Sequence, residues 1–158
     1  MLGFGRVAPP VIRPLRVERS ADCARLHAAA FAHPWSAEEI AALLADSSTL
    51  SAAALDPVNG RLRGFVIARL AADEAEILTL AVESHARGKG VGKALLGESL
   101  RQAANAGARK MFLEVGADNA SAIALYSRLG FVKVGKRAGY YRRADAPAPA
   151  IVMRKNLR

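Results

Sequence analysis

A glycine-rich loop between a strand pattern and a helix pattern constrains this chain more than any other feature. The loop reads Arg87-Gly88-Lys89-Gly90-Val91-Gly92; it follows the apolar run 77–82 and precedes an amphipathic helix expected over about residues 90–106. Glycines adopt dihedral angles that other residues avoid, and they leave backbone N–H groups accessible. The start of a helix attracts anions. The pattern therefore predicts a phosphate-binding loop at the edge of an α/β fold.

The spacing of the loop excludes two common kinds of phosphate site. A Walker A loop needs Ser or Thr after its Gly-Lys pair, and here Ala94 follows Gly92-Lys93. A dinucleotide fingerprint of the form G-x-G-x-x-G that starts at Gly88 would need glycine at position 93, which is lysine. The pattern that fits is [QR]-x-x-G-x-G, spelled by Arg87, Gly90 and Gly92.

The rest of the chain alternates strand and helix patterns after a loose, flexible tail at residues 1–11. Ser36 and Glu39 form a capping box, and Asn59-Gly60 marks a hairpin turn. The order predicts one mixed α/β domain over residues 12–158, with a sheet covered by helices. Strands are expected at 11–17, 49–55, 62–70, 75–82, 110–115, 131–134 and 151–153, and helices at 20–31, from 37, at 90–106 and at 119–130.

Composition limits the setting in which the protein works. No apolar run approaches the roughly 20 residues that span a bilayer, and Cys23 is the only cysteine. A single cysteine forms no internal disulfide, so we expect a reducing, cytoplasmic location and no membrane association. Cys23 and His27 lie four residues apart, and we expect a buried thiol beside a partly exposed imidazole. No histidine or cysteine pattern indicates a metal site, so none is expected.

The formal net charge of +9 indicates an anionic partner, which could be RNA, a phosphorylated cofactor or the ribosome. The basic residues are spread along the chain, with mild clusters at 87–93, 133–143 and 154–158. A solvated basic surface explains this distribution most simply, and we do not expect nucleic acid to be required.

The strand and loop at 77–92, continuing into Lys93-Ala94-Leu95-Leu96, resemble the central acetyl-CoA motif of the GNAT family of N-acetyltransferases. The resemblance implies a GNAT-like, mostly antiparallel mixed sheet flanked by helices, in which a bulged central strand splays from its neighbour. It also implies acetyl-CoA as co-substrate. By this resemblance the strand residues Leu80, Ala81 and Val82 contact the pantetheine arm, and the loop residues Arg87, Gly88, Lys89, Gly90, Val91, Gly92 and Lys93 hold the pyrophosphate.

A second block resembles a bacterial subgroup of that family, the RimI enzymes. It matches their pattern L-E-V-x-x-x-N-x-x-A-x-x-L-Y-x-x-x-G-F from Leu113 to Phe131. The resemblance implies Glu114 as general base, Tyr126 as general acid and a cofactor contact from Asn119, which also suits a helix N-cap. The chemistry agrees, because a single carboxylate acting through water can deprotonate an α-amine of pKa about 8. A phenol can protonate the departing thiolate.

Two further segments resemble the acceptor loops of the same subgroup. Pro34-Trp35-Ser36 and Arg137-x-x-Tyr140-Tyr141 imply that Trp35, Tyr140 and Tyr141 contact an incoming peptide. Pro149 departs from the pattern, since family members commonly carry an acidic residue there. The implied reaction is acetylation of a protein N-terminal α-amine, that of the N-terminal alanine of a small-subunit ribosomal protein. Two alternatives stay open: a GNAT enzyme for lysine side chains or small amines, and a non-catalytic acetyl-CoA-binding or ribosome-associated module.

Overall fold

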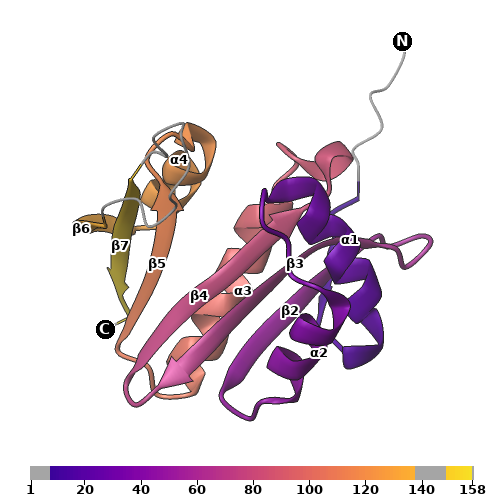
Figure 1. Cartoon of the computed structure of the whole chain (residues 1–158), viewed down its shortest axis with the longest axis horizontal. Helices are drawn as coiled ribbons and strands as arrows, with labels where there is room; N and C mark the ends of the chain where they lie inside the picture. Colours follow the sequence, from indigo (N-terminus) through magenta and orange to yellow (C-terminus); the bar gives the residue numbers. More distant parts are fainter. Residues whose placement is uncertain (1–7, 138–148, 158) are drawn as a thin grey trace.

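Seven strands form one sheet in the order β1-β2-β3-β4-β5-β7-β6 within the residues that the structure, a computed structural model, describes, 8–137 and 149–157 (Figure 1). The sheet is antiparallel except where β4 and β5 run parallel. This confirms the expected mixed α/β fold. The strands are β1 (Val11–Arg13), β2 (Thr49–Leu55), β3 (Leu62–Ala71), β4 (Glu74–Val82), β5 (Lys110–Gly116), β6 (Val132–Arg137) and β7 (Ala150–Asn156). The helices are η1 (Val17–Arg19), α1 (Ser20–Ala30), α2 (Ala37–Ala45), η2 (Ser84–Ala86), α3 (Val91–Asn105) and α4 (Ala120–Arg128).

The helix starts follow from local side chains. The Ser36 hydroxyl accepts the Glu39 N–H at 3.1 Å, so α2 begins where the capping box predicts. Asn119 caps α4 by accepting the Ala122 N–H at 3.2 Å. Ser20, the predicted cap of α1, is instead its first residue, and its hydroxyl donates to the Val17 carbonyl at 2.6 Å.

Two strands differ most in length from their sequence patterns. β1 ends at Arg13 rather than at position 17, because Pro14 has no N–H to continue the ladder with β2. β7 runs over seven residues rather than three, because it pairs with β5 from Lys110↔Asn156 to Gly116↔Ala150. This last strand in the chain lies inside the sheet, between β5 and β6.

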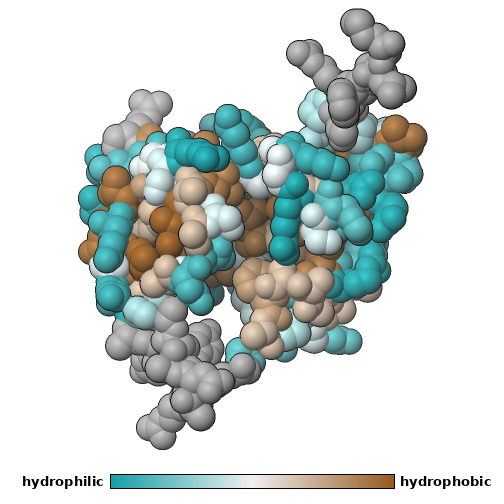
Figure 2. Space-filling view, turned by 90° about the horizontal axis from the view of Figure 1, so that it is seen from above, coloured by the Kyte–Doolittle hydropathy of each residue, from teal (hydrophilic) through white to brown (hydrophobic). Residues whose placement is uncertain are grey.

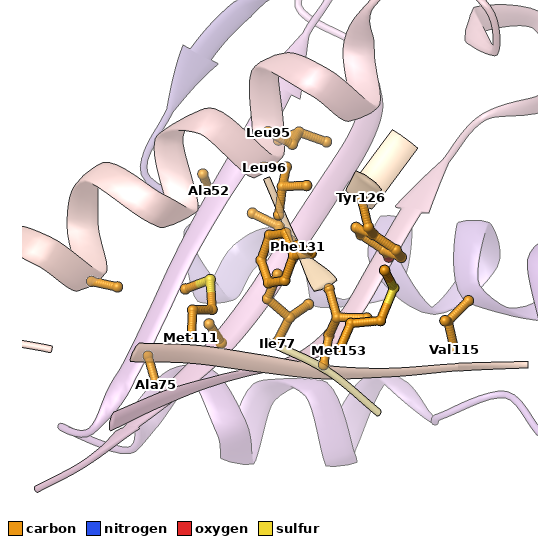
Figure 3. Packing of buried hydrophobic residues seen from close by; sticks show 14 of the residues in the cluster. Ala52, Ala75, Ile77, Leu95, Leu96, Met111, Val115, Tyr126, Phe131 and Met153 are labelled. Carbon is orange, nitrogen blue, oxygen red and sulfur yellow. The ribbon is translucent and has the colours of Figure 1, made fainter. Parts of the chain in front are cut away.

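The two faces of the sheet carry separate apolar clusters. On one face, α3 and α4 cover a cluster that includes Leu95, Leu96, Met111 and Tyr126 (Figure 3). On the other face, α1 and α2 cover a cluster that includes Phe65 and other buried side chains of β3. Each fully buried large apolar side chain contributes roughly 1.5–3 kcal/mol. The sheet is therefore held from both sides, and the position of its strands is fixed.

None of the helices among the described residues is long and apolar enough to cross a membrane. Over the same part of the chain, no group of three His, Cys, Asp or Glu side chains is placed to hold a metal ion.

Candidate active site

The split between β4 and β5 is the feature around which the site is built. The two strands pair only from Glu74↔Lys110 to Glu76↔Phe112 and then diverge (Figure 1). A β-bulge accompanies the divergence, because Ile67 of β3 pairs with Thr79 and Ala68 with Ile77, which leaves Leu78 as an extra residue. A bulge increases the local twist of its strand. Seen from above, the open end of the split is a hollow between the two halves of the molecule, and apolar side chains lie in it (Figure 2).

The main chain of β4 presents to this split hydrogen-bonding groups that neither neighbouring strand uses. The Glu83 N–H donates to the Arg63 carbonyl of β3 at 2.8 Å. In an antiparallel ladder the residues alternate in the side to which their backbone groups point. Ala81, two residues away from Glu83, therefore bonds toward β3, whereas Leu80 and Val82 direct their N–H and C=O groups into the split. That edge suits an extended ligand with amide groups, which would bind like an added strand.

A cradle for anions lies at the open end of the split. Gly88 and Gly90 have φ angles of +74° and +83°, a region that favours glycine. The first hydrogen bond into α3 runs from the Ala94 N–H to the Gly90 carbonyl at 3.0 Å, so the N–H groups at the start of the helix have no acceptor within it. Lys89 and Lys93 add positive charge. The expected loop residues thus form one continuous nest.

Two contacts fix this cradle to the strands. The Arg87 Nε donates to the Val82 carbonyl at 3.3 Å, which ties the loop to the end of the open edge. Gly92 lies where α3 approaches α4, since a Cβ there would come within 3.2 Å of the Leu125 Cδ2 atom. Asn119, at the start of α4, uses its side-chain oxygen for the helix cap. Together these residues fit a ligand that joins a pyrophosphate to a long amide-bearing arm.

Glu114 and Tyr126 lie on opposite faces of β5. Glu114 alternates with the core residues Leu113 and Val115, so its side chain faces the side of α1 and α2. It is 36% exposed, and its Oε1 atom lies 3.0 Å from the Arg137 guanidinium. Tyr126 belongs to the same cluster as Leu113 and Val115, so a group threaded through the split would have one of these side chains on each side.

The environment of Tyr126 favours a protonated phenol. The side chain is only 8% exposed, and its ring meets Phe131 edge-on with the centroids 5.9 Å apart (Figure 3). Burial raises the pKa of Tyr126 above its usual value of 10.0. The phenol therefore keeps its proton near neutral pH and can donate it.

Thr79 is a site residue that the sequence did not indicate. Its hydroxyl is buried, and it has no hydrogen-bond partner among the described residues. Once the bulge at Leu78 is allowed for, Thr79 stands two positions beyond Glu76, as Glu114 stands two beyond Phe112. The two side chains therefore lie on the same face of the sheet, one on each of the two diverging strands. In a strand pattern a threonine signals only β propensity, so sequence alone carried no sign of this role.

The acceptor loop before α2 packs on a buried histidine. The Trp35 N–H donates to the His27 Nδ1 atom at 3.0 Å, and the His27 ring stacks between Phe31 and Trp35, with centroids 4.3 and 4.8 Å away. His27 is 3% exposed, which corrects the expectation of a partly exposed imidazole. Desolvation lowers its pKa, so the ring is neutral and Nδ1 accepts.

The other side chains named from the sequence are placed as follows. Cys23 is buried as expected, and burial raises its pKa to about 12, which leaves an inert thiol. Pro149 accepts the Ala117 N–H at 2.9 Å and extends the pairing of β5 with β7. Tyr140 and Tyr141 lie outside the described residues.

A bulged strand, a split parallel pair and a glycine-rich loop at a helix start define an α/β protein whose site is suited to a phosphorylated ligand in extended form. The chain belongs to the acetyltransferase (GNAT) family, whose model matches residues 20–131. The limited pairing of β4 with β5 confirms the splayed strand pair that the sequence resemblance implied. The family match confirms the resemblance itself.

Two relatives and one solved structure illustrate the similarity. The [Ribosomal protein bS18]-alanine N-acetyltransferase of Escherichia coli K12 is 38% identical over 95 residues, which cover 60% of this chain and 64% of that protein. The N-alpha-acetyltransferase RimI of Mycobacterium tuberculosis is 41% identical over 75 residues, 48% of this chain and 46% of that protein. In both cases the matched segment spans less than two thirds of the relative. The crystal structure of the Escherichia coli ribosomal-protein-S18-alanine N-acetyltransferase superposes with a TM-score of 0.83 at 31% identity, over 93% of each chain.

Proposed function

We propose that this protein transfers an acetyl group from acetyl-CoA to the N-terminal α-amine of a protein. The observation that carries the proposal is the placement of Glu114 and Tyr126 on opposite faces of a split with an open strand edge. The acceptor we propose is the N-terminal alanine of a small-subunit ribosomal protein. The name of the Escherichia coli relative, a [Ribosomal protein bS18]-alanine N-acetyltransferase, supports that choice. The name of the Mycobacterium tuberculosis relative, an N-alpha-acetyltransferase, supports the α-amine as acceptor.

The cradle and the open edge would hold the co-substrate. Acetyl-CoA supplies an activated thioester whose leaving group is a thiolate. The N–H groups at the start of α3 suit its pyrophosphate, with about 1.5–3 kcal/mol for each hydrogen bond to a charged acceptor. Leu80 and Val82 offer main-chain partners to the amides of its arm, and Asn119 lies beside its path at the start of α4.

Glu114 would act as the general base on the acceptor side. The Arg137 guanidinium, 3.0 Å away, orients the carboxylate. The Thr79 hydroxyl, on the same face of the sheet and without a partner among the described residues, would hold the water that relays the proton from the amine. An α-amine has a pKa of about 8 against about 10.4 for lysine, so freeing its lone pair near pH 7 costs roughly 3 kcal/mol less. A single carboxylate suits that easier task.

Tyr126 would act as the general acid on the opposite face. Burial keeps its phenol protonated, as its raised pKa shows. A phenol in that position donates its proton, or a hydrogen bond, to the departing sulfur. Trp35, stacked on His27, flanks the acceptor side together with Tyr140 and Tyr141, which are assigned from the sequence resemblance.

The test uses purified protein, acetyl-CoA and synthetic peptides that differ in their first residue. Mass spectrometry locates the added acetyl group. We expect acetylation at the free amine of an alanine-first peptide and none on an N-blocked peptide that contains lysine. Acetylation of the blocked peptide or of small amines would replace the proposal with a different acceptor. Acetyl-CoA binding without any transfer would favour a non-catalytic module.

A further inference from the structure

The positive charge of the chain is concentrated in its last quarter. Residues 119–158 contain nine of the 23 Lys and Arg residues but only one of the 14 Asp and Glu residues, so they carry +8 of the net charge of +9. The bases are spread along the chain, but the acids are not. A charge difference of this size between two parts of one chain is typical of a surface that meets a polyanion.

The described members of this set lie on one part of the fold, α4, β6 and β7, which we call the basic lobe (Figure 1). Among the described residues, one base of the lobe has an ion pair, Arg137 with Glu114. All the other ion pairs of the described chain lie within residues 19–101, where acids are available. The described bases of the lobe are Arg128, Lys133, Lys136, Arg137, Arg154 and Lys155.

The cations of the edge strand β6 and of its neighbour β7 lie on both faces of the sheet. β6 pairs only with β7, so its outer edge is open. Lys133 pairs with Met153, on the face of α4, whereas Val132 pairs with Arg154, on the opposite face. Lys133 and Lys136 are exposed, and the neighbouring Val132 and Val134 are 55% and 43% exposed. An extended chain of phosphates along this edge could reach cations from both faces.

Two simpler explanations account for only part of the pattern. The cofactor phosphates have their own cations at the start of α3, in Arg87, Lys89 and Lys93. Lysines on an edge strand discourage pairing with other chains, but that need does not explain why α4 and β7 also lack acids. A polyanion that follows the whole lobe explains all three elements.

We propose that the basic lobe binds RNA through its phosphate backbone, a property beyond the transferase function. RNA is favoured over an acidic protein segment because the cations extend over three elements, α4, β6 and β7, and a nucleic acid strand carries a negative charge at every nucleotide along such a path. Among the described residues of this edge, the exposed apolar side chains are valines rather than aromatic residues, so they offer contacts to backbone charge and no surface for base stacking.

The test measures binding of a fluorescent single-stranded oligouridylate by anisotropy between 50 and 200 mM salt. Four phosphate contacts would give a slope of log K against log salt of about −3, since each contributes about −0.7. The double variant Lys133→Glu/Lys136→Glu should bind at least tenfold more weakly and lose about 1.4 from that slope. The control Arg16→Glu/Arg69→Glu makes the same charge change at exposed positions outside the lobe and should bind like the parent.

Several outcomes would overturn the proposal. Equal weakening in both double variants would mean that only net charge matters. Displacement of the RNA by CoA would place it in the cofactor cradle, and equally tight binding of polyglutamate would indicate an acidic protein partner. Absence of binding at 50 mM salt would also overturn it. Acetylation of the alanine-first peptide should be the same in all three proteins, so a failure of the RNA proposal is separate from a failure of the transferase proposal.

Discussion

The two sides of β4 share one strand but have different tasks. Toward β3 the strand is paired along its whole length, from Ala71↔Glu74 to Gly64↔Val82. Toward β5 it is paired at three positions and then left open. The paired side sets the position of the strand, and the open side offers its main-chain groups to a ligand. Changes on the open side should therefore alter activity at nearly constant stability, and changes behind the paired side should alter stability.

The largest effect is expected from the base on the wall of the split. Glu114→Gln should lower kcat by roughly 10²–10⁴-fold, because the amide cannot accept the proton. Acetyl-CoA binding measured by calorimetry should not change. The matched control is Glu76→Gln, on the same face but at the closed end, where β4 and β5 still pair. Full turnover in Glu114→Gln would remove that residue from the role of base.

The next effect is expected from the acid on the other face. Tyr126→Phe should lower kcat by at least 10²-fold, the lower end for general acid catalysis, because the thiolate would leave without a proton donor. The ring contact with Phe131 is kept, so the melting temperature should stay within a few degrees. Unchanged single-turnover rates would show that Tyr126 serves packing alone.

The cradle should respond to a single methyl group. Gly90→Ala puts a side chain at φ +83°, where there is space but the backbone conformation is strained. Distorted N–H groups should weaken acetyl-CoA binding about tenfold, equivalent to one lost hydrogen bond to a charged acceptor. Gly97→Ala in the middle of α3 is the control: it has open space and an ordinary helical conformation, and should raise stability by about 0.5–1 kcal/mol. Equal affinity in both variants would argue against the cradle.

A smaller effect should come from the buried hydroxyl on the same face of the sheet as Glu114. Thr79→Val keeps the shape of the side chain but removes the hydroxyl, and should lower kcat several-fold with little change in KM. Thr79→Ser should restore most of the rate. Because no hydrogen bond among the described residues is lost, stability should not fall, and it could rise by about 1 kcal/mol. A drop in stability without a drop in kcat would make Thr79 structural only.

The smallest effect concerns the pH dependence of stability that arises from His27, which packs against Trp35 beside β3. The pKa of His27 is lowered in the fold, so below its unfolded value of 6.5 the unfolded chain binds more protons, and stability falls as the pH falls. Thermal melts at pH 7.5 and pH 5.5 should show a larger loss for the parent than for His27→Asn, which cannot be protonated. His85→Asn is the control, since His85 lies in η2 outside the buried clusters. An equal melting temperature of the unmutated protein at pH 7.5 and pH 5.5 would contradict the neutral, buried state of His27.

Local signals in the sequence predicted most of the scaffold. The Ser36 cap, the hairpin at Asn59-Gly60 and the glycines before α3 all act over a few residues, so their patterns identify them directly. The positions of Thr79 and His27 depend on partners far along the chain. The placement of Thr79 on the same face as Glu114 requires the bulge at Leu78, and burial of His27 requires the turn that brings Trp35 back onto it. Contacts between distant segments determine the positions of these two residues, and sequence periodicity does not reveal such contacts.

The place of β7 in the sheet has a consequence for the order in which the molecule is completed. Strands β1 to β4 pair with neighbours in chain order, whereas β5 receives its antiparallel partner only from residues 150–156. On a ribosome, the cradle at the start of α3 can therefore form early, while β5, which carries Glu114, keeps one edge unpaired until residues 150–156 have been made. Contacts between distant segments form slowly, so the newly made enzyme should gain affinity for its cofactor before it gains turnover.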